Sequence, residues 1–391
     1  MASRSLFALI LLLALGIAGA AQSRYPYQMP TVSDNQIAFV YAGEIWAVDR
    51  RGGEAHVIVT APAAEKVTPI FSPDGSQLAF SMSVGGNLDV YVIPAAGGEA
   101  RRLTYHPKED AVAGWTPDGK TVLFRSRRVT DSRHELYTIP ARGGFETQLP
   151  LPLAWDGAYS PDARSLAYTP LGDPTRSWRN YRGGQTSPIW IADLANSQTQ
   201  ALPRDNSNDR SPMWVGNKIY FISDRTLTAN LFAYDTQTKK TEQVTRFEKY
   251  DIRAASSGGS GDQAAIVFVQ DGAIHLLDLK TNQERTVPVT ISKADWAETT
   301  ARAVKIGRWI RSYNLSPDGS QALFGARGEI LTVNLATGEM RNLTRTSGAA
   351  ERTPVWSPDG KSIAYYSDQS GEYQLHIQAT GDGSVKKVAV E

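Results

Sequence analysis

The chain has 391 residues, with 41 basic and 40 acidic side chains and no cysteine. The resulting formal charge of +1 gives no support for a nucleic-acid partner, because such proteins usually carry a basic stripe. The absence of cysteine excludes disulfides, thiolate metal sites and cysteine nucleophiles.

Residues 1–21 are predicted to form a secretory signal peptide. Arg4 precedes an unbroken apolar run over 6–15, and small residues at 18–20 supply a cleavage site. The run is shorter than the about 20 apolar residues that span a bilayer. We therefore expect export to the bacterial periplasm or exterior, with no membrane attachment after cleavage. An uncleaved N-terminal anchor is the alternative.

A turn of the Ser-Pro-Asp-Gly type recurs along the remaining chain. Its five copies begin at Ser72, Thr116, Ser160, Ser316 and Ser357. An apolar run that ends in an aromatic residue marks each repeat, and we call these eight residues the register aromatics: Phe39, Phe80, Phe124, Tyr168, Phe221, Phe268, Phe324 and Tyr365. Self-similarity at about 40–50 residues, with strands and turns in every unit, is typical of a β-propeller.

The second repeat shows what one unit contains. Its apolar and turn residues predict four short strands, at 66–71, 77–81, 88–93 and 100–104. Turn residues separate the first strand from the second and the third from the fourth. Four antiparallel strands per repeat make one propeller blade. The predicted fold class is therefore all-β, built from four-stranded antiparallel blades.

The strand order also predicts which loops share a face. With the strands of a blade named A to D, the short A–B and C–D turns lie at one end. The longer and more variable B–C and D–A loops lie at the other end, which we call the loop face. Binding residues usually sit on variable loops carried by a rigid scaffold. Functional residues are therefore expected on the loop face.

The repeats are interrupted at 291–312, which we interpret as a linker. Six blades over 25–290 are enough to close a ring, whereas two blades over 313–391 are not, since propellers need at least four. We predict a six-bladed propeller followed by the first two blades of a second, truncated propeller, so the chain resembles the front part of a longer protein. A single eight-bladed ring is the alternative.

An insertion over 171–187 separates the second and third strands of blade four. It contains Trp178, Arg179, Tyr181 and Arg182. An aromatic residue and arginines on a long loop favour recognition of an anionic or planar group. The alternative is a loop that folds back over the propeller.

Taken together, the six repeats, the insertion at 178–184 followed by Ile189-Trp190-Ile191, and the renewed repeats after a linker resemble the tricorn protease family. The resemblance implies a TolB/tricorn-type six-bladed propeller, a seven-bladed one, and then a PDZ domain flanked by serine peptidase halves that cut oligopeptides. The catalytic residues would lie beyond this chain, so none is assigned here. The chain itself would guide or filter peptides without a cofactor or metal. A homo-oligomer of the full-length protein is a further expectation.

In that family, the first propeller supplies two adjacent arginines that hold a substrate carboxylate. Arg127-Arg128, in the B–C loop of blade three, is the better match. Arg101-Arg102 falls in a fourth strand and is the poorer one. The candidate substrate-binding residues are Arg127, Arg128, Trp178, Arg179, Tyr181 and Arg182. A free-standing TolB-like periplasmic propeller that binds a protein partner is the alternative function.

Other motifs favour structural roles. His275 and His376 occupy third-strand positions of their blades and are expected to pack within them. The oxygen-rich segment 205–209 has ligands that suit a cation, but its composition equally suits a turn. There is no G-x-S-x-G elbow, H-E-x-x-H motif or phosphate loop in the sequence.

Overall fold

The computed structural model describes residues 26–59, 64–129, 133–173, 175, 179–292, 310–346 and 348–388. The described strands form eight sheets, in each of which the four strands of one blade pair antiparallel in the predicted A–B–C–D order, and the first sheet gains a fifth strand, described below. Blades one to three contain β1 (Gln28–Val32), β2 (Gln36–Tyr41), β3 (Glu44–Asp49), β4 (Gly53–Val59), β5 (Glu65–Phe71), β6 (Gln77–Val84), β7 (Asn87–Pro94), β8 (Arg101–Arg102), β9 (Asp110–Trp115), β10 (Thr121–Ser126), β11 (Glu135–Pro140) and β12 (Thr147–Gln148).

Blades four to six contain β13 (Asp156–Tyr159), β14 (Ser165–Thr169), β15 (Trp190–Asp193), β16 (Thr199–Ala201), β17 (Asp209–Val215), β18 (Lys218–Ser223), β19 (Asn230–Asp235), β20 (Thr241–Gln243), β21 (Ala254–Gly258), β22 (Ala265–Gln270), β23 (Ala273–Asp278) and β24 (Gln283–Val287), with the 3-10 helix η2 (Gly261–Gln263) between β21 and β22. Blades seven and eight contain β26 (Ile310–Leu315), β27 (Gln321–Ala326), β28 (Glu329–Asn334), β29 (Met340–Asn342), β30 (Glu351–Trp356), β31 (Ser362–Ser367), β32 (Gln374–Ala379) and β33 (Val385–Val388).

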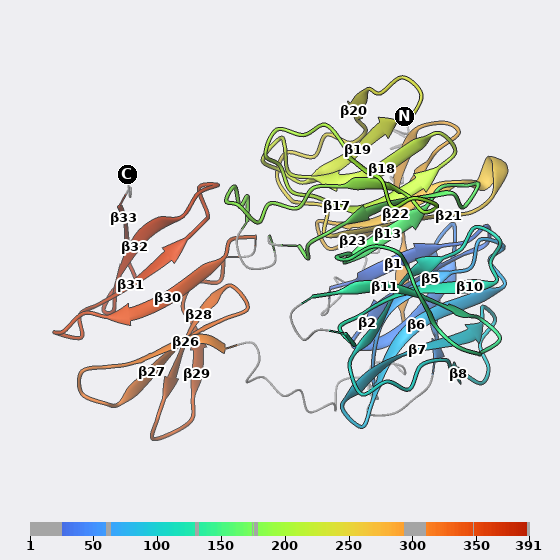
Figure 1. The fold of residues 1–391 in the computed structure, drawn as a ribbon. Coiled ribbons are helices and arrows are strands. Elements are labelled where there is room, and N and C mark those ends of the chain that lie inside the picture. The colour runs from blue at the N-terminus through green and yellow to red at the C-terminus, as the bar shows by residue number, and fades with distance from the viewer. Residues whose placement is uncertain are drawn as a thin grey trace, which may run out of the picture.

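The first six blades form a closed ring. Each inner strand, from β1 through β5, β9, β13 and β17 to β21, contacts the next, and β21 contacts β1. Blades seven and eight, drawn in orange and red in Figure 1, pack on each other through β26 and β30. This confirms the predicted all-β propeller fold, and the ring closes after six blades rather than eight.

The register aromatics define the two faces of every blade. We call the face that carries the register aromatic the front face, and the opposite face the back face. Phe80 of blade two packs with Ala38 of blade one, and Phe124 of blade three packs with Ala79 of blade two. The same rule holds at the other interfaces between successive ring blades, so each front face covers the back face before it.

Contacts between residues far apart in the sequence close the ring. The front face of blade one, with Phe39, packs on the back face of blade six. After blade six, β25 (Val289–Ile291) returns to blade one and pairs in parallel with β4. Arg50 adds hydrogen bonds from its guanidinium to the carbonyl oxygens of Ser33 at 2.8 Å and Gln263 at 2.7 Å.

The repeated turn has one hydrogen-bond pattern. In the first copy, the Ser72 hydroxyl donates to the Asp74 carboxylate at 2.6 Å, and the backbone N–H of Gln77 donates back to Ser72 Oγ at 3.0 Å. The Ser72 hydroxyl is the main reason why the pKa of Asp74 is lowered. Gly75 adopts a φ of 70°, which a residue without a side chain tolerates. Local chemistry alone therefore shapes this turn.

Some predictions fall on residues that the structure does not describe. The signal peptide at 1–21, Trp178, and most of the linker predicted at 291–312 lie outside the described residues. The domain boundaries at 290 and 313 therefore stay predictions. Among the described residues, no helix has the length and apolarity needed to cross a membrane.

Candidate functional site

The structure places the B–C and D–A loops together at one end of the blades, as the strand order predicts. At the opposite end of blade two, the N–H of Ala95 donates to the carbonyl of Ser76, which places the C–D turn beside the A–B turn. The B–C and D–A loops consequently share the other end. The insertion over 171–187 lies there, between β14 and β15.

Arg128 is held within the framework of blade three. Its side chain is 8% exposed, and its guanidinium pairs with Asp110 at 2.8 Å and with Glu146. It also stacks over the rings of Phe124 and Tyr137, at 5.2 and 4.7 Å from their centroids. A guanidinium with two carboxylate partners is already neutralised, so this environment does not leave Arg128 free to hold a substrate carboxylate.

Arg225 of blade five repeats the arrangement of Arg128. It pairs with the buried Asp209 at 3.0 Å and lies over the rings of Phe221 and Phe232, at 5.3 and 4.8 Å. In both blades the arginine follows the register aromatic by four residues. That spacing was the signal in the sequence for a repeated structural role.

Arg127 has a more open environment than its neighbour. Its side chain is 41% exposed and lies 3.7 Å from the Glu109 carboxylate, an ion pair of the kind that contributes little when exposed. The two adjacent arginines therefore do not present two free guanidinium groups. Substrate binding by Arg127 stays a prediction.

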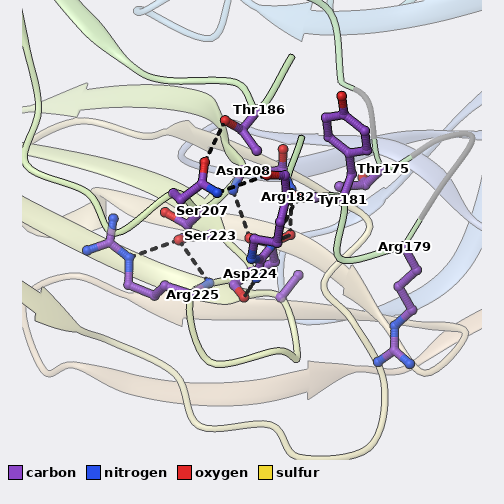
Figure 2. A network of polar contacts seen from close by, with 12 residues as sticks. Thr175, Arg179, Tyr181, Arg182, Thr186, Ser207, Asn208, Ser223, Asp224 and Arg225 are labelled. Carbon is purple, nitrogen blue, oxygen red and sulfur yellow. Dashed lines mark hydrogen bonds and ion pairs between the residues drawn. The ribbon is translucent and has the colours of Figure 1, made fainter. Parts of the chain in front are cut away.

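The insertion docks on blade five through a buried polar network (Figure 2). The Arg182 guanidinium donates to Asp224 Oδ2 at 2.8 Å and to the Asp224 carbonyl at 2.9 Å. The amide of Asn208 donates to the Tyr181 carbonyl at 2.8 Å and to Asp224 Oδ2 at 2.7 Å. The segment 205–209 thus supplies groups that anchor the insertion.

Arg179 is also paired within the chain. Its guanidinium lies 3.1 Å from Asp251, in the loop that leads to blade six. None of the five described candidates, Arg127, Arg128, Arg179, Tyr181 and Arg182, lines the central cavity of the ring. These candidates therefore lie outside the central cavity, and the described part of the insertion contacts blade five and the loop before blade six. Their part in substrate binding stays a prediction.

A central cavity of about 790 Å³ lies in the ring. All six inner strands line the cavity, so it lies along the axis of the ring, between the loop face and the opposite end.

Three of the inner strands bend at a β-bulge. The first residue of each bulge has a positive φ and precedes a proline, and these residues are Met29, Thr68 and Ser211. Proline suits a bulge because it has no N–H to donate to the ladder.

Charged residues that were not among the predicted site residues line this cavity. Arg210 is 9% exposed and is held by Asp173 at 3.2 Å and by the carbonyl of Ile252 at 2.9 Å. Arg253 lines the same cavity and is exposed. Arg125 stacks on Trp155 at 4.5 Å. The mainly apolar lining of the cavity thus includes an exposed cation, Arg253, whose guanidinium suits the carboxylate of a peptide.

The described histidines with aromatic neighbours are packing residues. His275 stacks on Phe268 with ring centroids 5.2 Å apart and bonds Glu284 at 2.6 Å. His376 lies edge-on to Tyr365 at 5.5 Å. This confirms the structural role predicted for both. Among the described residues, no group of three His, Asp or Glu side chains is arranged to hold a metal ion.

His134 should make stability depend on pH. Burial, with Arg125 and Arg127 nearby, lowers its pKa to about 4, and its ring lies 4.3 Å from that of Trp155. The folded chain keeps this imidazole neutral. The contribution of His134 to the free energy of unfolding is therefore present above the unfolded pKa of about 6.5 and is lost as the pH falls toward 4. From pH 7 to 4.5, the wild type should lose about 1.5 kcal/mol more unfolding free energy than His134→Gln, after discounting for partial exposure. Urea titrations at both pH values measure this.

The matched control is His56→Gln, because His56 is exposed. It should keep the pH dependence of the wild type. Equal pH dependence in the wild type and the His134→Gln variant would contradict the prediction.

Comparison with known proteins gives consistent matches. Residues 25–283 match the family model of the tricorn protease N-terminal beta propeller domain. Tricorn protease homolog 1 of Streptomyces coelicolor is 27% identical over 374 residues, which cover 94% of this chain and 34% of that protein. The tricorn protease of Thermoplasma acidophilum is 25% identical over 312 residues, which cover 77% of this chain and 28% of that protein.

A solved structure shows the same fold. The crystal structure of the tricorn protease matches with a TM-score of 0.59 at 19% identity, covering 94% of this chain and 45% of that chain. The chain spans about a third of the length of the curated relatives it matches.

Proposed function

The chain belongs to the family of the tricorn protease N-terminal β-propeller domain, and from that premise we propose that it is the non-catalytic propeller portion of an exported serine peptidase that degrades oligopeptides. Its role is to guide or filter peptides toward catalytic segments outside this chain. The observation that carries the proposal is the central cavity of about 790 Å³, which all six inner strands line.

The cavity wall supports a peptide ligand. An extended peptide offers backbone amides along its length and a carboxylate at one end. Arg253 supplies an exposed guanidinium, and such groups bind carboxylates in bidentate fashion. Asp173 holds Arg210, and Arg125 stacks on Trp155, so these two side chains are positioned before a ligand binds.

We propose that blades seven and eight begin a second propeller over 313–391. They repeat the turn and the strand order of the ring blades. Export is proposed from the apolar run at 6–15 and the small residues at 18–20. N-terminal sequencing of protein recovered from cells tests export, since a form that still begins at residue 1 would contradict it.

The purified chain should bind peptides without hydrolysing them. Binding of a labelled oligopeptide with a free carboxylate is measured by fluorescence anisotropy, and turnover by release of a fluorogenic group. Arg253→Glu should weaken binding about tenfold, which corresponds to about 1.4 kcal/mol. Arg127→Glu in the same assay tests the other candidate separately.

Two results would overturn the proposal. The first is hydrolysis that a serine-directed inhibitor abolishes in a preparation free of contaminating peptidase. The second is absence of peptide binding by the folded chain at millimolar peptide.

A further inference from the structure

Asp-Gly pairs are places where a protein backbone can rearrange without an enzyme. The glycine nitrogen attacks Cγ of the aspartate, a C–N bond forms and water leaves, which gives a succinimide ring. Water then opens the ring at either carbonyl, to aspartate or to isoaspartate, in which the main chain runs through Cγ. Glycine has no side chain to hinder the attack. The sequence contains seven such pairs, which begin at Asp74, Asp118, Asp156, Asp271, Asp318, Asp359 and Asp382.

Four of the pairs belong to the repeated turn, where both reacting groups are hydrogen-bonded. The Asp318 carboxylate accepts from the Ser316 hydroxyl at 2.6 Å and from the N–H of Ser320 at 3.0 Å. The N–H of Gly319 donates to the Ser316 carbonyl at 2.9 Å. The same bonds hold the pairs at Asp74, Asp118 and Asp359. The attack requires such bonds to open, which slows it.

Two further pairs are also held. The Asp382 carboxylate accepts from the N–H of Ser384 at 3.0 Å, and Gly383 donates to a backbone carbonyl at 3.1 Å. Asp156 and Gly157 open β13, where Gly157 is buried and its N–H donates to the Asp156 carboxylate at 2.9 Å. Pairing of β13 with β14 fixes the backbone of this pair. Six of the seven pairs are therefore restrained.

The pair Asp271-Gly272 has a different environment. It forms the two-residue turn between β22 and β23 on the loop face, with φ values of 47° and 75°, and both residues are exposed. Within the described parts of the chain, no hydrogen bond engages the Asp271 carboxylate or the Gly272 N–H. A Cβ built at Gly272 would meet no atom within 4 Å, so no group packs against the turn there.

We propose that Asp271 is a site of spontaneous isoaspartate formation in the folded chain, and that the fold protects the other six pairs. The carboxylate and the nitrogen that must meet at 271–272 have no hydrogen bonds to lose. The product carries one more methylene in the main chain, which a two-residue turn closed by the pair Gln270 and Ala273 does not accommodate. The modification therefore loosens the B–C hairpin of blade six.

The same turn recurs in other blades without a reactive carboxylate. Ala42-Gly43 in blade one and Gly85-Gly86 in blade two join the second and third strands, and all four residues have positive φ. The φ of Ala42 is 53°, close to that of Asp271. The turn thus does not need an aspartate, so substitutions can remove or add the reactive group while the hairpin is kept.

Peptide mapping of the full chain tests the proposal. The folded chain is kept at physiological temperature and mildly acidic pH for several weeks, then digested with trypsin, which places each Asp-Gly pair on a separate peptide. Isoaspartate is recognised by altered elution at unchanged mass and by its backbone fragmentation. Its fraction at residue 271 should grow about tenfold faster than at any other pair, because hydrogen bonds must open at the others.

Two comparisons separate the effect of the fold from that of the sequence. In concentrated guanidinium chloride the seven pairs lose their different environments, and isoaspartate should form at all of them at similar rates. Asp271→Ala should abolish the main product and keep the hairpin, as Ala42 does in blade one. Gly85→Asp places an aspartate before Gly86 in a matching turn, where a Cβ would meet no atom within 4 Å, and should create a second reactive site.

Two results would overturn the proposal. The first is a folded chain in which another of the seven pairs reacts as fast as Asp271, or in which Asp271 stays unmodified while the denatured chain reacts there. The second is a Gly85→Asp variant, shown to be folded by circular dichroism, that forms no isoaspartate at residue 85. Either result would mean that this exposed turn does not permit the attack or that the hydrogen bonds elsewhere do not prevent it.

Discussion

A Gly258→Ala variant is expected to lose about 3 kcal/mol of its free energy of unfolding, because residue 258 lies where the ring closes. A Cβ atom there would stand 1.9 Å from the carbonyl oxygen of Val32. Both positions belong to the backbone of packed inner strands, so no side-chain rotation relieves the overlap. The strands must move apart, and the contact between blades one and six weakens with them.

Denaturant titration followed by circular dichroism measures this loss. Gly381→Ala is the matched control, since no atom lies within 4 Å of a Cβ built there. It should change the free energy of unfolding by less than about 0.5 kcal/mol. Hydrogen exchange in β1 and β21 adds a local measurement, and should become faster in the Gly258→Ala variant. A loss below about 0.5 kcal/mol in that variant would show that the closure adapts, contrary to this account.

An Asp224→Ala variant is expected to lose about 3 kcal/mol of unfolding free energy and to release the insertion. Asp224 is 2% exposed, and its carboxylate accepts from the Asn208 N–H at 2.8 Å, the Asn208 amide at 2.7 Å and Arg182 at 2.8 Å. Removing it leaves a partly buried guanidinium and two donors without their acceptor. Denaturant titration measures the stability, and limited proteolysis with trypsin measures exposure of the insertion.

The control is Glu242→Ala, which breaks an exposed ion pair with Lys218 on the same blade. That pair is expected to contribute less than about 1 kcal/mol. A double-mutant cycle between Asp224 and Arg182 isolates their coupling. Wild-type stability and unchanged tryptic cleavage in the Asp224→Ala variant would show that the network does not anchor the insertion.

Much of the fold was predictable because its signals are local. Turn residues and short apolar runs predicted the strands of blade two at 66–71, 77–81, 88–93 and 100–104, and the structure forms β5 to β8 there. The register aromatics were also informative, since each has a fixed place on the second strand of its blade. Strand order then determined which loops share the loop face.

The environment of the candidate arginines depends on contacts that are distant in the sequence. Adjacent arginines indicated a carboxylate clamp, but Asp110 and Glu146 neutralise Arg128. These partners lie 18 residues away on either side, in other strands or loops of the blade. The sequence next to Arg127 and Arg128 does not indicate which guanidinium forms ion pairs in the folded chain.

The sequence by itself determined the blade, its turns, the loop face and the number of repeats, because strand order and turn chemistry depend on residues close together in the chain. Only the tertiary structure decided that β25 pairs with β4, that Asp224 holds Arg182, and that Arg210 and Arg253 line the central cavity. Each of these contacts joins residues brought together by closure of the ring or docking of a loop. Their pairing depends on burial and geometry that no short stretch of sequence specifies.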